Sequence, residues 1–181
     1  MKRIVKQGML CVAFTAALAT VPALRAQQTR ITQTAAVPAA IVDGKKAFIS
    51  NAGVDSTSLA IFKRDGDPDE SYNKFYVAMK NWGRYELVAA PSDADLVFEI
   101  RFTAPLTDCG KAAIYDPQLN LAIVDAKTHF RLWTITEPVQ GALRSRKATW
   151  DKNFSQGMTN LVNDMRRLAA PPAATGNPGN D

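Results

Sequence analysis

Two side chains, Cys109 and His129, have the types that nucleophilic catalysis needs. A thiol attacks a carbonyl when a nearby base removes its proton, and histidine is the usual base. His129 is the single histidine of the chain, and the only other cysteine is Cys11. Both Cys109 and His129 are expected beside strand ends, so a thiol-dependent hydrolase using this pair is one hypothesis. Their spacing does not require them to meet, and a solvent-facing turn is the simpler interpretation of His129.

Alternating carboxylates near residue 67 suggest a calcium-binding loop. Asp65, Asp67 and Asp69 occupy alternate positions, as the ligands of such a loop do. However, Glu70 stands where the loop needs a glycine for its sharp turn. A helix start explains the same residues, because Asp67 can cap the helix, Pro68 suits its first position and Glu70 can complete a capping box. We therefore expect a helix cap and not a metal site.

The other polar motifs indicate no catalytic, cofactor or metal site. Asp93 and Asp95 have an adequate role in a turn, which explains them without acid–base chemistry. One cysteine and one histidine leave half of a tetrahedral zinc site without a recognisable ligand spacing. Residues 108–111 (DCGK) contain a Gly-Lys pair but lack the preceding glycine of a phosphate-binding loop. We therefore predict no bound cofactor.

The basic charge of the chain is concentrated at its start. There are 22 Lys and Arg residues against 17 Asp and Glu residues, a formal net charge of +5. Residues 1–26 hold four of the basic residues and no acid, which leaves 18 basic against 17 acidic residues in the rest. Nucleic acids and anionic membranes bind concentrated basic surfaces. We therefore expect no nucleic-acid partner and at most a peripheral membrane contact.

Residues 1–26 have the pattern of a secretory signal peptide. Three basic residues precede an apolar stretch at 9–18, and small residues surround the expected cleavage site after Ala26. The apolar stretch is shorter than the ~20 residues that span a bilayer. Cys11 lacks the preceding small residues of a lipidated cysteine, so we expect export to the periplasm or the medium. Cleavage leaves Cys109 as the only cysteine, either buried and unreactive or available to another chain.

The rest of the chain is expected to divide into a lead-in, one domain and a tail. Residues 27–40 are polar and alanine-rich and predict a flexible lead-in. Residues 169–181 are rich in proline and glycine and predict a disordered tail. The intervening residues 41–168 are enough for a single domain with one hydrophobic core.

Hydrophobic periodicity within the domain predicts five strands and two helices. The expected strands are 46–51, 85–89, 96–102, 119–125 and 130–136, the expected helices are 67–82 and 151–168, and residues 103–118 are expected to form a loop. This order predicts an α+β fold, with a mainly antiparallel sheet of about four to five strands and two amphipathic helices packed on one face.

Three segments of the domain resemble small exported domains of the bacterial envelope. They are residues 81–85 (NWGRY), 92–97 (SDADLV) and the hairpin 124–133, which begins VDAKT and ends LW. This layout is similar to the TolB amino-terminal domain and to curli-assembly (CsgG-like) lipoprotein domains, in which an Ala-Asp turn enters a strand and an Asp-x-Lys-Thr hairpin follows. The resemblance covers most of 45–168. It implies an accessory or assembly role in the envelope and carries over no catalytic residues.

These observations predict an exported, non-enzymatic accessory domain that binds another envelope protein. The contact surface is expected on the exposed sheet face or on an edge strand, which offers unpaired backbone groups. The alternatives are an enzyme using Cys109 and His129, and a carrier of an apolar small molecule held between helices and sheet. The oligomeric state stays open. The candidate interaction residues are Trp133, Arg144, Arg146 and Lys147, with Trp150 as a further candidate.

Overall fold

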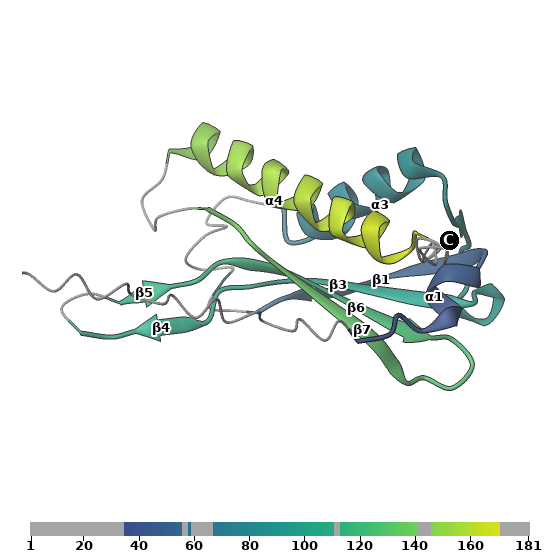
Figure 1. Ribbon diagram of the computed structural model, residues 1–181. Coiled ribbons are helices and arrows are strands. Elements are labelled where there is room, and N and C mark those ends of the chain that lie inside the picture. The colour runs from purple at the N-terminus through teal and green to yellow at the C-terminus, as the bar shows by residue number, and fades with distance from the viewer. Residues whose placement is uncertain (1–34, 56–57, 59–66, 111–112, 141–145, 171–181) are drawn as a thin grey trace, which may run out of the picture. The chain divides into compact units, whose positions relative to one another are not determined.

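The structure is a computed structural model of the 181-residue chain (Figure 1). It describes residues 35–55, 58, 67–110, 113–140 and 146–170. The chain divides into two units, residues 1–35 and 36–181, and every described helix and strand belongs to the second unit. The expected signal peptide lies outside the described residues, as do Asp65 and Arg144.

The central element is a five-stranded sheet with the order β2–β1–β3–β6–β7. Its strands are β1 (Lys46–Val54), β2 (Glu86–Leu87), β3 (Leu96–Thr103), β6 (Gln118–Asp125) and β7 (Arg131–Pro138). The α+β class is confirmed, but the sheet is mixed and not mainly antiparallel. β1 is parallel to β2 and to β3, whereas β6 is antiparallel to both of its neighbours. In the chain, a helix (residues 70–82) follows β1 and precedes β2 and β3. Such a crossover helix returns the chain to the end of the sheet where β1 begins, so β2 and β3 can run parallel to β1.

Two long helices, α3 (Glu70–Trp82) and α4 (Lys147–Leu168), lie on one face of the sheet, as predicted (Figure 1). A short helix, α1 (Ala39–Asp43), begins inside the expected lead-in. α4 begins at Lys147 and not at 151. Among the described residues, no helix is long and apolar enough to cross a membrane.

The start of α3 differs from the predicted cap, and its end agrees with the prediction. The Asp67 carboxylate accepts the N–H of Asp69 over 2.9 Å, which holds residues 67–69 in a turn before the helix. Asp69 therefore occupies the N-cap position, and the helix begins at Glu70. At the other end Gly83 has a φ of 68°, a left-handed conformation that glycine adopts without strain.

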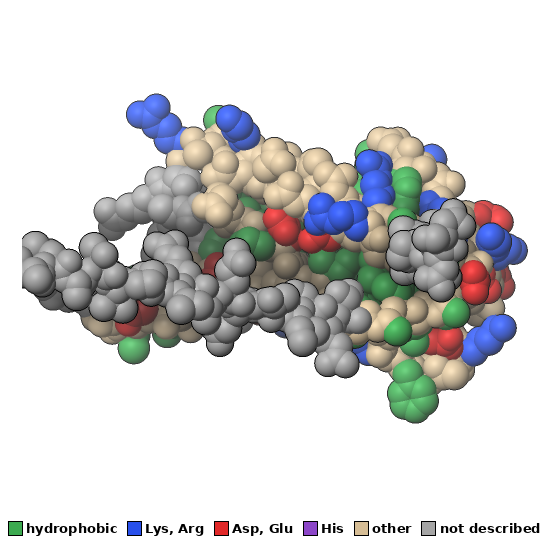
Figure 2. Space-filling model, viewed as in Figure 1, with side chains coloured by type: hydrophobic (Ala, Val, Ile, Leu, Met, Phe, Trp, Pro, Cys, Tyr) green, Lys and Arg blue, Asp and Glu red, His purple; other side chains and the backbone are tan. Residues whose placement is uncertain are grey.

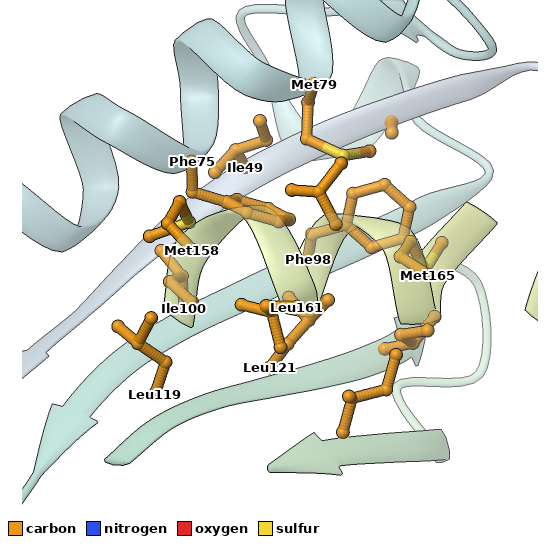
Figure 3. Close-up of a cluster of buried hydrophobic side chains, with 14 of the residues drawn as sticks. Ile49, Phe75, Met79, Phe98, Ile100, Leu119, Leu121, Met158, Leu161 and Met165 are labelled. Atoms are coloured by element: carbon orange, nitrogen blue, oxygen red, sulfur yellow. The ribbon is translucent and has the colours of Figure 1, made fainter. Parts of the chain in front are cut away.

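The core fills the layer between the sheet and the two long helices (Figure 3). On β3, alternate side chains point into this layer and are fully buried, as the alternation predicted. The largest fully buried residues include Phe75 and Met79 of α3, Phe98 and Ile100 of β3, Leu119 and Leu121 of β6, and Phe154 and Leu161 of α4. The alternative of a carrier with its ligand in this layer stays a prediction.

Residues 103–118 are not a plain loop, because they contain a second sheet of two strands. β4 (Leu106–Asp108) and β5 (Ile114–Tyr115) pair antiparallel and project beyond the five-stranded sheet (Figure 1). They continue the hairpin formed by β3 and β6, and the Asp116 N–H donates to the Pro105 carbonyl over 3.0 Å. We call the described residues 105–110 and 113–116 the arm. Strands this short have no detectable alternation, so periodicity did not predict them.

Candidate functional site

The face of the sheet turned away from α3 and α4 carries a groove of about 760 Å³. Side chains alternate along a strand, so the residues between the buried ones on β1, β3 and β6 face this side. The groove is lined by Phe48, Ser50, Pro91, Ser92, Val97, Glu99, Val124, Ala126, His129 and Arg131. The sequence predicted an exposed sheet face as the contact surface, and the groove lies on the sheet face that no described helix covers.

The groove combines an apolar floor with a few ionisable groups. Phe48, Val97 and Val124 come from three neighbouring strands and are each half-buried. Glu99 contributes one carboxylate, and Arg131 contributes a cation from β7. Binding sites typically pair apolar surface, which provides affinity, with a small number of polar groups, which fix orientation. This arrangement therefore suits a largely apolar ligand that also carries polar groups.

The turn between β6 and β7 forms one end of the groove and is fixed by the Asp125 carboxylate. Its Oδ1 accepts the N–H of Lys127 over 3.0 Å and the N–H and hydroxyl of Thr128 over 2.7 and 2.9 Å. The bonds from Thr128 are the main reason why the pKa of Asp125 lies below its usual range. His129 completes the turn with a φ of 58°, a left-handed conformation that few non-glycine residues adopt.

Phe130 follows this turn and is 75% exposed, the largest exposure among the described large hydrophobic residues that lie on the surface. The two residues that flank it, His129 and Arg131, both line the groove. The Phe130 carbonyl accepts the N–H of Asp125 over 3.0 Å, so its backbone is held in place. Sequence reasoning missed Phe130 as a site residue, because it was assigned to the strand predicted at 130–136. An aromatic residue two positions after the threonine of a tight Asp-x-x-Thr turn was the available signal.

Asp95 fixes the neighbouring part of the same end. Its Oδ2 accepts the backbone N–H of Lys45 over 2.9 Å and that of Lys46 over 3.0 Å. These two bonds, from Lys45 and then Lys46, lower the pKa of Asp95 from its usual value. The Asp95 carbonyl in turn accepts the N–H of Ala126 over 3.1 Å. The segments 92–97 and 124–128, which carried the envelope-domain resemblance, thus meet and together build one end of the groove.

Of the predicted interaction residues, the structure describes Trp133, Arg146, Lys147 and the further candidate Trp150. Trp133 is partly buried and packs against the core, and Trp150 is 8% exposed, with its ring centroid 5.9 Å from that of Phe102. Arg146 and Lys147 are exposed at the start of α4, where the Lys147 Nζ lies 2.9 Å from an Asp151 carboxylate oxygen. None of these four residues lines the groove.

Cys109 and His129 do not form a catalytic pair. β3 and β6 pair from Leu96–Asp125 at one end to Thr103–Gln118 at the other. His129 lies beyond the first end and Cys109 in the arm beyond the second, so about 25 Å of paired strand separates them. Cys109 is a free, exposed thiol, and the alternative of a buried cysteine is therefore wrong. Within the described part of the chain, no three His, Cys, Asp or Glu side chains are grouped to hold a metal ion.

Comparisons with known proteins give only distant similarities. No protein-family model matches the chain, and no curated protein matches it. The PelC dodecamer from Paraburkholderia phytofirmans is similar at 14% identity and a TM-score of 0.43, over 73% of this chain and 92% of the PelC chain. Lipoprotein GNA1162 from Neisseria meningitidis is similar at 11% identity and a TM-score of 0.37, over 66% of this chain and 99% of that one. The LpoB C-terminal domain from Salmonella enterica is similar at 11% identity and a TM-score of 0.36, over 54% and 84%. The specific likeness to TolB and CsgG-like domains stays a prediction.

Proposed function

We propose that this chain is an exported, non-enzymatic domain of the cell envelope that binds another envelope protein through the groove on its open sheet face. Export is supported by the basic and apolar pattern of residues 1–26. Binding is supported by the groove and the turn at its end. The observation that carries the proposal is Phe130, 75% exposed beside a groove of about 760 Å³.

Phe130 has the position of an anchor residue. A phenylalanine left in water gives up about 1.5–3 kcal/mol that burial would provide. The turn that presents it is fixed by the three hydrogen bonds to Asp125, so little conformational freedom is lost when a partner covers the ring. Aromatic residues held in this way dominate the binding energy of many protein interfaces.

The shape of the groove favours a segment of a partner protein over a small metabolite. It follows a sheet face across β1, β3, β6 and β7 and, among the described residues, is partly open to solvent. Small-molecule sites instead enclose most of the ligand surface. An extended segment with apolar side chains can contact Phe48, Val97 and Val124, while Glu99 and Arg131 can set its direction through their opposite charges.

Site-directed photocrosslinking in the producing cell tests this proposal. A photoreactive phenylalanine analogue placed at Phe48, Val124 or Phe130 should capture one and the same protein, to be identified by mass. The matched control is Val77 on α3, which is 57% exposed and lies on the helical side of the sheet. The captured protein should then bind the purified chain and lose affinity for a Val97→Arg variant. Equal capture from Val77, or no capture from the groove positions, would contradict the proposal.

A further inference from the structure

The arm exposes apolar side chains that the rest of the described chain does not cover. Leu106 on β4 is 51% exposed and Ile114 on β5 is 52% exposed. The arm projects beyond the five-stranded sheet (Figure 1), and β4 and β5 form a two-stranded sheet that no other described strand joins. A two-stranded sheet is marginally stable in water unless something packs against it. The arm is therefore expected to be covered by another surface when the protein works.

A basic surface lies at the same end of the molecule. Arg146, Lys147 and Lys152 are exposed at the start of α4, and Figure 2 shows Lys and Arg side chains there. The first turn of α4 contains no acidic residue, although the positive end of a helix dipole favours acids. The ring contact of Trp150 with Phe102, at 5.9 Å, places this helix start beside the end of β3, from which the arm extends.

The arm carries the opposite charge to the start of α4. Asp108 and Asp116 are exposed on the arm, and Lys111 lies outside the described residues. The carboxylates of the arm are therefore complementary in charge to the basic residues at the start of α4. Both complementary parts belong to one end of one chain. An interface with two-fold symmetry requires this, because each copy must offer both halves of the contact.

We propose that this end of the molecule binds a second copy of the chain, with the arm of each copy lying against the start of α4 of the other. Leu106 and Ile114 supply apolar contact, and the Asp108 and Asp116 carboxylates face Arg146 and Lys147 of the second copy. The groove lies at the opposite end of β3 and stays accessible. The dimer thus presents two grooves. The dimer proposal goes beyond the proposed function and does not depend on it.

A charge-swap experiment tests the dimer. One variant reverses the arm (Asp108→Lys with Asp116→Lys), and the other reverses the helix start (Arg146→Glu with Lys147→Glu). Each variant alone brings like charges together and should weaken dimerisation about a hundredfold. An equal mixture of the two restores both opposite-charge contacts, so a heterodimer should form. Sedimentation velocity of the native chain, each variant and the mixture provides the readout. Lys80→Glu with Glu86→Lys is the matched control and should leave the dimer intact.

A disulfide trap provides a second test if a charge-reversed chain fails to fold. Two chains, both with Cys11→Ser, are mixed: one keeps Cys109, and the other carries Cys109→Ser and Lys147→Cys. The proposal predicts a disulfide between the two different chains under mild oxidation. A native chain that stays monomeric at every concentration would overturn the proposal. A dimer that neither charge reversal weakens, or a mixture that forms no heterodimer, would overturn it as well.

Discussion

Asp95 and Lys46 are joined by two hydrogen bonds, and the backbone N–H of each residue donates one of them. The Asp95 N–H donates to the Lys46 carbonyl over 3.0 Å, and the Lys46 N–H donates to the Asp95 Oδ2 over 3.0 Å. The same carboxylate oxygen accepts the N–H of Lys45 over 2.9 Å. One side chain therefore holds the starts of β1 and β3 together at the end of the sheet where the groove lies.

Removing this carboxylate should destabilise the fold. Asp95→Ala leaves two backbone N–H groups without their acceptor, and because the site is exposed to water we expect a loss of about 1 kcal/mol in the free energy of unfolding. Asp93→Ala is the matched control, since its carboxylate accepts only a 3.3 Å bond from the neighbouring Ser92 hydroxyl among the bonds described. Urea unfolding followed by circular dichroism measures both variants. Equal stability of the two variants would remove this role of Asp95.

The same hydrogen bonds predict an acid-dependent loss of stability. The pKa values of Asp95 and Asp125 are lowered in the folded state, mainly because backbone N–H groups donate to each carboxylate. A lowered pKa favours the folded state when the group is ionised, so this stabilisation is complete above the ordinary value of 3.8 and is lost as the pH falls below it. A variant with Asp95→Asn and Asp125→Asn should be less stable near pH 7 and converge with the native chain at low pH. Unfolding curves that run parallel at all pH values would contradict this.

Local periodicity was sufficient to predict the helices and most of the strands. The alternation of Phe98, Ile100 and Phe102 with polar residues identified β3, and the spacing of Phe75 and Met79 identified the buried face of α3. These signals are local, because burial on one face of a strand or helix imposes its period directly on the sequence. The fold class and the packing of both helices on one face followed from them.

Strand direction and the arm could not be predicted in this way. β2 pairs with β1 over two residues only, so no pattern marks it as a parallel edge strand. The strand predicted at 130–136 was expected to end before Pro138, yet β7 extends through this residue. β7 lies at the edge of the sheet, where the missing N–H of a proline removes no bond to a further strand. Such properties depend on which strands become neighbours, and this is decided by the tertiary structure.

The groove is lined by residues other than those that the sequence pattern suggested as interaction residues. An exposed sheet face was expected as the contact surface, whereas Trp133 was named and Arg131 was not. β7 contains one extra residue between its pairs with Ile123 and Val124, so Trp133 and Arg131 face opposite sides of the sheet. A one-residue bulge reverses the alternation beyond it, and the strand pattern gives no sign of the reversal.

The Tyr85 hydroxyl should lose its proton at a higher pH than an ordinary tyrosine does. It is 4% exposed, its hydroxyl donates to the Ile41 carbonyl over 2.7 Å, and burial raises its pKa to about 12 against a smaller opposing effect of Arg84. The stabilisation from the neutral phenol is complete below about pH 10 and is lost as the pH rises towards 12. In an absorbance titration, one tyrosine should lose its proton at a higher pH than the others. This step should be absent from Tyr85→Phe and retained in Tyr76→Phe. Tyr85→Phe should also cost about 1 kcal/mol of stability through the lost bond. A late phase that survives Tyr85→Phe would refute the assignment.

Cys109 should react quickly with thiol reagents and have no catalytic role. Its thiol is free and exposed in the arm, remote from His129 at the other end of β3. In a chain that carries Cys11→Ser and is diluted until it is monomeric, Cys109 should be labelled by a disulfide reagent at the rate of an unfolded control. Adding Cys109→Ser should abolish labelling while leaving stability and capture of the partner unchanged. Slow labelling of this monomer would show that the chain itself protects the thiol. If Cys109→Ser no longer captured the partner, the Cys109 thiol would be required for binding.

Phe130 should affect binding without affecting folding. Because the ring is 75% exposed, Phe130→Ser should change the free energy of unfolding by less than about 0.5 kcal/mol. Loss of about 1.5–3 kcal/mol of apolar burial should weaken binding of the crosslinked partner roughly 10- to 100-fold. Val77→Ser is the matched control, since Val77 is 57% exposed on α3 and should alter neither quantity. Titration calorimetry with the partner and urea unfolding measure the two quantities separately. If Phe130→Ser binds as the native chain does, the groove end is not the anchor. If Phe130→Ser unfolds at a lower urea concentration than the native chain, the ring stabilises the fold, and its exposure is no sign of a binding role.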